Sequence, residues 1–442
     1  MKNKKAKKDA LKKFLIIFII LLISAGSIIN LIINTQEEEN ILVFYHSWVS
    51  PSEQAAINAL INVFSSEYPD ATVIPTPIVT QSAGGGGLAL FNLVKPMVFE
   101  KKAPDAFQMH AGYEAKTFVD AGLLENVDKI WKSENLEKVV PKTVQAMCQF
   151  QGNYYSVPIN IHRTNVIWYN KKILDNNGIN PDKIITWDEF FSACDKLKKA
   201  GIKYPIQMGT TWTAQHAFDQ IVASLGVDFY ENWVNGKVIS PSDPKLIEAF
   251  SIFQKYLSYT NPDNLNVSWD EATSRIISGE GAFNIMGDWA NGEFRAAGEK
   301  YNEDYGSFKV PGTEKMYGLV IDAFQLPKGI QHPANAKNWL KVVASKDGQD
   351  AFNPLKGSIS ARIDTNISKY DAYQQSAILD FLVTKYMFPA ISNGAPKEFE
   401  QKEQEVIAQF IKDRDTNKAT EEITNYIKSI SIDYTITWEL DS

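Results

Sequence analysis

The sequence of 442 residues has little of what most catalytic and metal-binding motifs are built from. It contains two cysteines and five histidines, and no HExxH pair is formed. A GxSxG nucleophile motif and a GxxxxGK[ST] phosphate loop are also missing. Because no lysine follows the four glycines at 84–87, we interpret them as a flexible loop. These absences argue against an enzyme, and we assign no catalytic residue.

The two cysteines, Cys148 and Cys194, form no CxxC motif and cannot build a metal cluster by themselves. Both lie in apolar helical contexts, so we predict that they are small core residues, with a single disulfide as the alternative. We expect neither a metal nor a cofactor.

Basic residues are scarce outside the N-terminus. The formal net charge is −7, but residues 1–13 contain seven lysines and one aspartate and carry +6, which leaves −13 for the rest. An acidic chain without a basic stripe argues against nucleic acid as a partner.

One long apolar run, FLIIFIILLISAGSIINLIIN at 14–34, follows the basic segment. It has about the ~20 residues that cross a bilayer, and the preceding lysines place 1–13 in the cytoplasm. We expect an uncleaved transmembrane anchor, a polar linker at 35–40 and an extracellular body. A cleaved signal peptide is the alternative, because Ser24-Ala25-Gly26 supplies small residues.

The body is long enough for two domains. It opens with alternating strands and helices, predicted at 41–45, 52–69, 71–79, 88–100 and 104–111. This alternation predicts an α/β lobe with a parallel or mixed sheet.

After Tyr155 the pattern is more helical, with an amphipathic helix from Thr186 to Gly201 and helices over the last 45 residues. Strand-like runs return at 282–288, 319–327 and 357–363. We therefore predict a first α/β lobe at 41–156 and 320–355. A helix-rich second lobe takes 157–319 and 356–442. Repeated crossings, the first at Val157-Pro158, predict a hinge with a cleft between the lobes.

Polar and aromatic side chains recur at predicted strand ends and turns, in HSWVSPSE, FQMHAG, VPINIHRTNVIWY, NVSWDEA, NIMGDWANG and NPLKGS. A sugar presents hydroxyls at its rim and C–H patches on its faces. Carboxylates and amides bind the former and aromatic rings cover the latter. Each residue taken alone also fits a core or turn position, but together they suggest a sugar-binding cleft.

From about Ile41 onward the chain resembles the extracellular solute-binding proteins of ABC sugar importers, and within them the glucose- and galactose-binding proteins. The segments that carry the resemblance include PDAFQMHAG, YSVPINIHRTNVIWYN, TWDEF, AFNIMGDWA, LPKG, SKDGQDAFNPLKGSISAR and SKYDAYQQSA. The resemblance implies a two-lobed α/β fold of the type II periplasmic-binding-protein kind, with a hinge and an interlobe cleft.

The resemblance also implies which residues hold the ligand. Carried over by position, they are Trp48, Glu53, His110, Trp269, Trp289, Asp322 and Lys356. Val49 stands where the family often has a second tryptophan, and Asn393 where close glucose binders have a histidine. We add Asn393 and His162 to the predicted ligand-binding residues, which makes nine. His162 and Asn160 fit a structural place in the hinge equally well.

The function implied is that of a monomeric receptor, anchored outside the cell membrane, which captures glucose or a related monosaccharide. It would deliver the sugar to the membrane subunits of an ABC transporter. Two alternatives stay open: a glycoside hydrolase with two cleft carboxylates, and a sugar sensor subunit. Residues 1–13 are too short for a cytoplasmic signalling domain, which disfavours the sensor.

Overall fold

The computed structural model describes residues 40–78 and 87–430. The predicted basic segment 1–13, the predicted anchor 14–34 and nearly all of the linker 35–40 lie outside the described residues. Of the predicted glycine loop only Gly87 is described. Within the described part, no helix has both the length and the apolar character that crossing a membrane would require.

A five-stranded mixed sheet forms the centre of the first lobe, in the order β2-β1-β3-β12-β6. Its strands are β1 (Ile41–His46), β2 (Thr72–Pro77), β3 (Ala106–His110), β6 (Ser156–Pro158) and β12 (Asp322–Gln325). Strand β1 is parallel to β2 and β3, whereas β12 is antiparallel to β3 and β6. The two antiparallel strands belong to the segments by which the chain leaves and re-enters this lobe.

Helices surround this sheet. They are α2 (Pro51–Glu67), α3 (Gly87–Phe99), α4 (Tyr113–Asp120), α5 (Asp128–Ser133), α6 (Leu136–Val139), α7 (Lys142–Cys148), α15 (Pro333–Ala344) and α16 (Lys346–Lys356), with a short hairpin of β4 (Gln149–Phe150) and β5 (Asn153–Tyr154). Helix α2 begins at a capping box of Ser50 and Glu53, with Pro51 in its first turn. The predicted alternation of strands and helices over 41–111 is confirmed.

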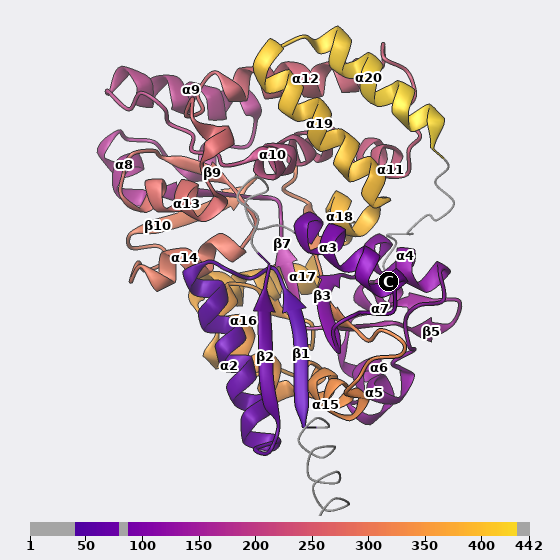
Figure 1. Ribbon diagram of the computed structural model, residues 1–442. Coiled ribbons are helices and arrows are strands. Elements are labelled where there is room, and N and C mark those ends of the chain that lie inside the picture. The colour runs from indigo at the N-terminus through magenta and orange to yellow at the C-terminus, as the bar shows by residue number, and fades with distance from the viewer. Residues whose placement is uncertain (1–39, 79–86, 431–442) are drawn as a thin grey trace, which may run out of the picture.

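The second lobe contains two sheets, ordered β13-β7-β11-β14 and β10-β8-β9. Their strands are β7 (Asn160–Arg163), β8 (Val166–Asn170), β9 (Phe283–Ile285), β10 (Tyr305–Lys309), β11 (Met316–Val320), β13 (Ile359–Ser360) and β14 (Tyr386–Pro389). Figure 1 shows β1, β2 and α2 in the lower lobe and most of the helices of the second lobe above them.

The helices of the second lobe are α8 (Lys171–Asn176), α9 (Trp187–Lys199), α10 (Thr211–Ser224), α11 (Val227–Val234), α12 (Pro244–Leu257), α13 (Trp269–Ile277), α14 (Trp289–Ala296), α17 (Ala372–Val383), α18 (Ile391–Gly394), α19 (Lys397–Asp413) and α20 (Thr416–Ser429), with 3-10 turns at η1 (Pro181–Lys183), η2 (Asn264–Asn266) and η3 (Ile367–Lys369). Helix α9 starts at a capping box of Thr186 and Glu189. The predicted helix from Thr186 is therefore confirmed.

The chain passes between the sheets of the two lobes at three places. Strand β6 continues into β7 through Ile159, and β11 continues into β12 through Ile321. Helix α16 leads to β13 through residues 357–358. The prediction of one strand over 319–327 is wrong, because β11 pairs with β7 while β12 pairs with β3 and β6. A continuous apolar pattern does not reveal such a change of sheet.

Two large apolar cores reflect the two lobes. The first contains Phe44 stacked on Trp339 at 4.4 Å between ring centroids, and it continues across the passages to Trp168. In the second core, the rings of Phe218 and Phe250 lie 4.7 Å apart. Cys148 belongs to the first core and Cys194 to the second, and both are buried free thiols. The prediction of small core residues is confirmed for both.

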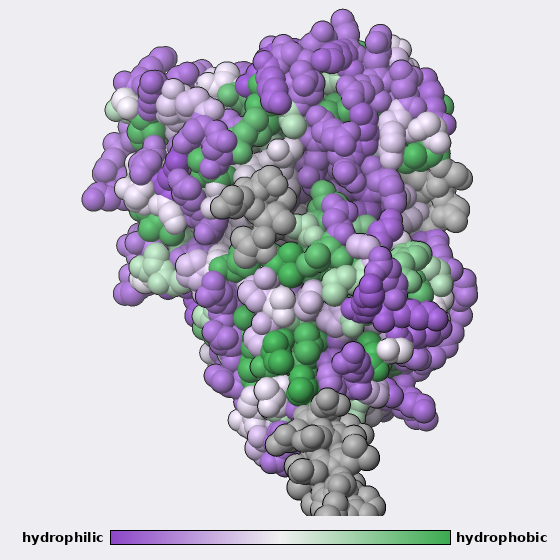
Figure 2. All heavy atoms as spheres, in the orientation of Figure 1, coloured by the Kyte–Doolittle hydropathy of each residue, from purple (hydrophilic) through white to green (hydrophobic). Residues whose placement is uncertain are grey.

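Polar side chains cover most of the face that Figure 2 shows, and apolar ones gather over the β1–β2 edge of the first sheet and over α3. The exposed apolar residues of β2 and α3 include Ile74, Leu93 and Phe99. Isolated exposed apolar residues are normal on soluble domains, so these alone define no site.

Candidate ligand-binding cavity

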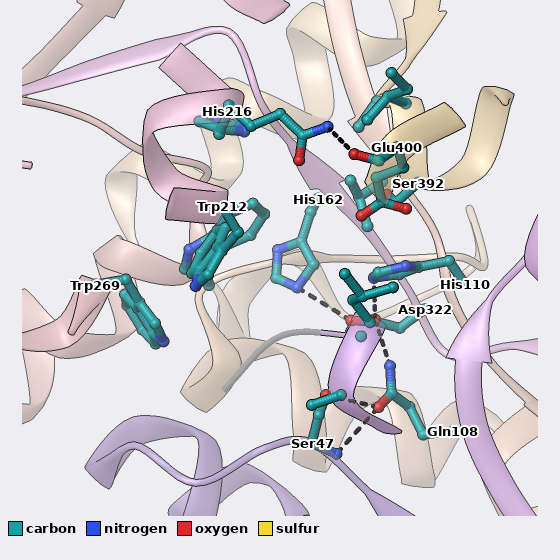
Figure 3. Close-up of a pocket in the computed structure, with 18 of the residues that line it drawn as sticks. Ser47, Gln108, His110, His162, Trp212, His216, Trp269, Asp322, Ser392 and Glu400 are labelled. Atoms are coloured by element: carbon teal, nitrogen blue, oxygen red, sulfur yellow. Dashed lines mark hydrogen bonds and ion pairs between the residues drawn. The ribbon is translucent and has the colours of Figure 1, made fainter. Parts of the chain in front are cut away.

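A cavity of about 140 Å³ lies between the two lobes, next to the passages. Eight of the nine predicted ligand-binding residues line it: Trp48, Glu53, His110, His162, Trp269, Trp289, Asp322 and Lys356. Figure 3 shows His110, His162 and Asp322 grouped centrally, with Trp212 and Trp269 to one side. Residues that are far apart in the sequence therefore meet where both lobes contribute walls.

Asp322 is bonded to side chains from both β3 and β7. Its Oδ1 accepts a hydrogen bond from Gln108 Nε2 at 3.0 Å, and its Oδ2 accepts one from Asn160 Nδ2 at 2.9 Å. His162 Nε2 lies 3.3 Å from Oδ2. Burial opposes ionisation, but His162, His110 and Lys356 together hold the pKa of Asp322 well below its usual range. The carboxylate is therefore a fixed negative charge at the β11–β12 passage.

His162 connects the two sides of the passage, because its ring lies between two buried carboxylates. Its Nδ1 contacts Asp288 Oδ1, and Asp288 Oδ2 accepts a hydrogen bond from the backbone N–H of Arg163 at 2.9 Å. Burial raises the pKa of Asp288 even though His162 opposes that change. The structure thus gives His162 both of the expected positions, in the wall of the cavity and in the framework of the passages.

His110 begins a second charged network, which reaches from the first lobe to α19. Its Nδ1 lies 3.0 Å from Glu114 Oε1, and the ammonium of Lys397 contacts the same carboxylate. Burial alone would raise the pKa of Glu114, but His110 and Lys397 lower it to about 2. Burial disfavours protonation of His110, yet Glu114 and Asp322 raise its pKa. The network holds the His110 ring against the cavity.

Glu53 and Lys356 form a buried ion pair with 2.9 Å between Oε1 and Nζ. The second oxygen of Glu53 accepts hydrogen bonds from the backbone N–H groups of Val49 and Ser50, at 3.0 and 3.2 Å. One carboxylate thus caps α2 and orients Lys356, whose Nζ lies 6.0 Å from the centroid of the Trp289 ring.

Tryptophan rings form the apolar wall. The centroid of the Trp289 ring lies 5.1 Å from that of His162 and 6.2 Å from that of Trp212. Trp269 is nearly fully buried. Trp48 packs mainly into the first core, with its ring 4.8 Å from that of Phe352. Flat apolar faces beside fixed hydrogen-bonding groups suit a compact ligand rich in hydroxyls. In the described part of the chain, no cluster of three His, Cys, Asp or Glu residues could hold a metal ion.

The family model of bacterial extracellular solute-binding proteins matches residues 48–350. The chain belongs to this family. The match includes Trp48, His110, Trp289 and Asp322, and it ends before Lys356 and the helices α17–α20. The family is one of receptors, and its members act outside the cytoplasm.

Individual relatives of this solute-binding protein extend the match. An uncharacterized ABC transporter extracellular-binding protein of Pyrococcus horikoshii is 40% identical over 400 residues, 89% of this chain and 88% of the relative. A probable sugar-binding periplasmic protein of Brucella melitensis is 32% identical, with 78% and 80% covered. The solved structure of the solute receptor AcbH, described as preferring β-D-galactopyranose, superposes with a TM-score of 0.76 at 17% identity, covering 88% of this chain and 98% of that one. The last match supports the two-lobed fold.

Asn393 is the predicted residue that does not line the cavity. Its Nδ2 donates hydrogen bonds to the carbonyl oxygens of Ala111 and Ile321, at 2.7 and 3.4 Å, and the residue is fully buried. Gly112 beside it has φ +94°, and a Cβ there would lie 2.3 Å from the Asn393 carbonyl oxygen. Asn393 therefore joins α18 to the first lobe, and its neighbour Ser392 faces the cavity instead.

One face of α10 lines the cavity but was not predicted from the sequence. Trp212, Gln215, His216 and Asp219 all line the cavity. They occur at positions i, i+3, i+4 and i+7, so they share one side of the helix. A stripe of polar and aromatic residues with helical period was the signal available. Ser47, Gln108, Ser392, Glu400 and Gln404 complete the polar lining, and no single motif marks them.

Proposed function

We propose that this protein is an extracellular receptor that binds a monosaccharide, glucose or a close relative, in the cavity between its lobes. The observation that carries the proposal is the pairing of the Trp289 face with Asp322, His110 and the Glu53–Lys356 ion pair around one small cavity. An aromatic face matches the C–H face of a pyranose, and ionised groups make the strongest bonds to hydroxyls. The probable sugar-binding role of the Brucella relative and the preference of AcbH for β-D-galactopyranose support a sugar ligand.

Calorimetric titration of residues 36–442 with glucose, galactose, mannose, maltose and trehalose tests the proposal. The expected result is one-to-one binding of one monosaccharide, with affinity in the micromolar range or tighter and no turnover. Binding of the disaccharides alone would support a sugar receptor but refute a monosaccharide as its ligand. Binding of none of the five would overturn the proposed function.

We further propose that the lobes 41–156 with 320–355, and 157–319 with 356–442, close around the sugar by rotation about the three passages. A ligand can favour the closed form only by binding it better than the open form. The closed receptor, acting as a monomer, would then dock on the membrane subunits of an ABC transporter. Small-angle scattering should show a smaller radius of gyration with saturating sugar than without it.

The anchor at 14–34 belongs to the same proposal, since a receptor tethered by its N-terminus stays near its transporter. Its basis is the apolar length of the segment and the lysines before it. N-terminal sequencing of the mature chain from membranes should give the start of the full sequence. A mature chain that begins near Ser27 would refute the anchor in favour of a cleaved signal peptide.

The alternative of a glycoside hydrolase needs one carboxyl group to donate a proton and another to attack or activate water. Glu53 is instead committed to Lys356 and to two backbone amides, and Asp322 to Gln108 and Asn160. No observation at these two groups favours catalysis. Incubation with chromogenic glucosides and galactosides should release no product.

A further inference from the structure

The cavity has a second end that the proposed monosaccharide contacts leave unused. We call it the α10–α19 end and define it by Gln215, His216, Asp219, Ser392, Glu400 and Gln404. In Figure 3, His216 and Glu400 lie at the opposite end of the view from Ser47 and Gln108. This end comes from helices of the second lobe, whereas the first end is built around the strands of the passages.

Two buried acceptors at this end have no donor. His216 Nε2 and Asp219 Oδ1 have no hydrogen-bond partner among the described residues, and the two side chains are 7% and 3% exposed. Burial lowers the pKa of His216 to about 4, although a hydrogen bond with the backbone of Thr164 acts in the opposite direction. The imidazole is therefore neutral. The two residues are three apart on α10, so they are neighbours on the same face of the helix. A buried acceptor without a donor costs free energy, and a ligand that donates hydrogen bonds would recover it.

The carboxyl groups at this end also outnumber the ammonium group beside them. Asp219 shares a hydrogen bond with Glu403, whose other contacts are with Gln215 Nε2 at 2.6 Å and Trp233 Nε1 at 3.0 Å. Glu400 adds a third carboxylate. The cation that faces them is Lys397, 2.7 Å from Glu400, and it is divided between Glu400 and Glu114. Three carboxyl groups therefore lie near one ammonium group, which is already shared with Glu114.

We infer that the α10–α19 end receives a protonated amine, so that the sugar bound by this receptor is an amino sugar. An ammonium offers three donors and no acceptor, which matches two bare acceptors in an acidic surrounding. A plain hydroxyl offers one donor and no charge. The inference rests on the proposed function and narrows its ligand class. Burial raises the pKa of both Asp219 and Glu403. Such a shift is expected for buried acids whose neutralising cation is supplied by a bound ligand.

Calorimetric titrations at about pH 6.5, below the pKa of an ordinary amine, test this inference. The probes are glucose, galactose, glucosamine, galactosamine, 6-amino-6-deoxyglucose and the uncharged N-acetylglucosamine. At least one amine should bind about tenfold tighter than its parent hexose, as a charge-assisted hydrogen bond allows. In Asp219→Asn that ratio of affinities should fall to about one. The matched control Glu405→Gln, which removes an acid 59% exposed on the same helix as Glu400, should keep the ratio.

The outcomes separate the inference from the function on which it rests. Binding of a neutral hexose with no preference for any amine would overturn the amino sugar and leave the receptor intact. A preference that survives in a folded Asp219→Asn protein, verified by circular dichroism and thermal unfolding, would also overturn it. Binding of none of the probes, neutral or charged, would refute the proposed function and this inference with it.

Discussion

The two ends of the cavity differ in how completely their polar groups are paired. The end beside the passages, which we call the passage end, contains Asp322, Glu53 and Asp288. Each of these carboxylates bonds to a cation, an imidazole or an amide within the protein. At the α10–α19 end, Asp219 and His216 each keep an acceptor without a hydrogen-bond partner in the described part of the chain, and carboxyl groups outnumber the nearby ammonium. A carboxylate that is paired within the protein holds its position before the ligand arrives, and an unpaired acceptor gains most when the ligand binds. We expect the first end to supply general affinity for a sugar ring and the second to select among sugars.

The passage end should depend most on its tryptophan. Trp289→Ala removes the ring that faces His162 and Lys356, so the affinity for the bound sugar should fall at least about thirtyfold, or ~2 kcal/mol. Calorimetry on the folded variant measures the loss. Trp187→Ala, on α9 and outside the cavity, serves as the control for general loss of packing. Unchanged affinity in Trp289→Ala would mean that the ring is a core residue and that the proposed ligand site is wrong.

The Asp322 network should show the next largest effect. Asp322→Asn places an amide donor where Gln108 and Asn160 already donate, and it leaves His162 without one of its carboxylates. We expect about 3 kcal/mol less free energy of unfolding in urea and about tenfold weaker sugar binding. Asp188→Asn, whose carboxylate is 97% exposed, should change neither quantity. Equal stability of the two variants would show that the passage end is not preorganised by this network.

The two ends should respond to pH in opposite directions. The pKa of Glu114 is lowered to about 2, so its share of the free energy of unfolding rises with pH from there to about 4.5. Burial raises the pKa of Glu403 to about 8, so the folded state binds more protons than the unfolded state between about pH 4.5 and 8. The contribution of Glu403 to the free energy of unfolding therefore falls as the pH rises through this range.

Asp219→Asn replaces the acid beside Glu403 with a neutral amide, as protonation of Asp219 would. The substitution should therefore reduce the loss of stability between about pH 4.5 and 8. Its melting temperature without ligand should exceed that of the unchanged protein by about 2 °C at pH 8.5, and by less at pH 5. Scanning calorimetry at both pH values measures the difference. A constant offset at all pH values would mean that the carboxyl pair does not titrate as one unit.

Asn393→Ala should have the smallest effect on sugar binding, less than about twofold, because the amide bonds to Ala111 and Ile321 rather than to the cavity. The loss should appear as stability, on the order of 1 kcal/mol or more for two buried carbonyls left without a donor. A large loss of affinity with unchanged stability would restore Asn393 to the ligand site.

The sequence carried local information reliably. The alternation over 41–111 and the helix that begins after Thr186 depend on neighbouring residues, and both form as expected. The prediction for 319–327 failed because Leu319 and Phe324 both look like strand residues, and only pairing with distant strands assigns them to different sheets. The resemblance to a family named seven residues that line the cavity, and His162 was predicted beside them. Asn393 does not line it, because its amide bonds to main-chain atoms that carry no sequence signal.

The class of molecule could be predicted without a structure: an acidic α/β protein with tryptophans and carboxylates at strand ends. The acidity follows from composition and the α/β pattern from periodicity, whereas the two lobes and the solute-binding family follow from the resemblance. Which charges are neutralised depends on tertiary contacts. Whether a carboxylate is paired depends on the group that folding brings within about 3 Å of it. Lys356 reaches Glu53 across 303 positions, while Asp219 Oδ1 meets no donor within 40–78 and 87–430.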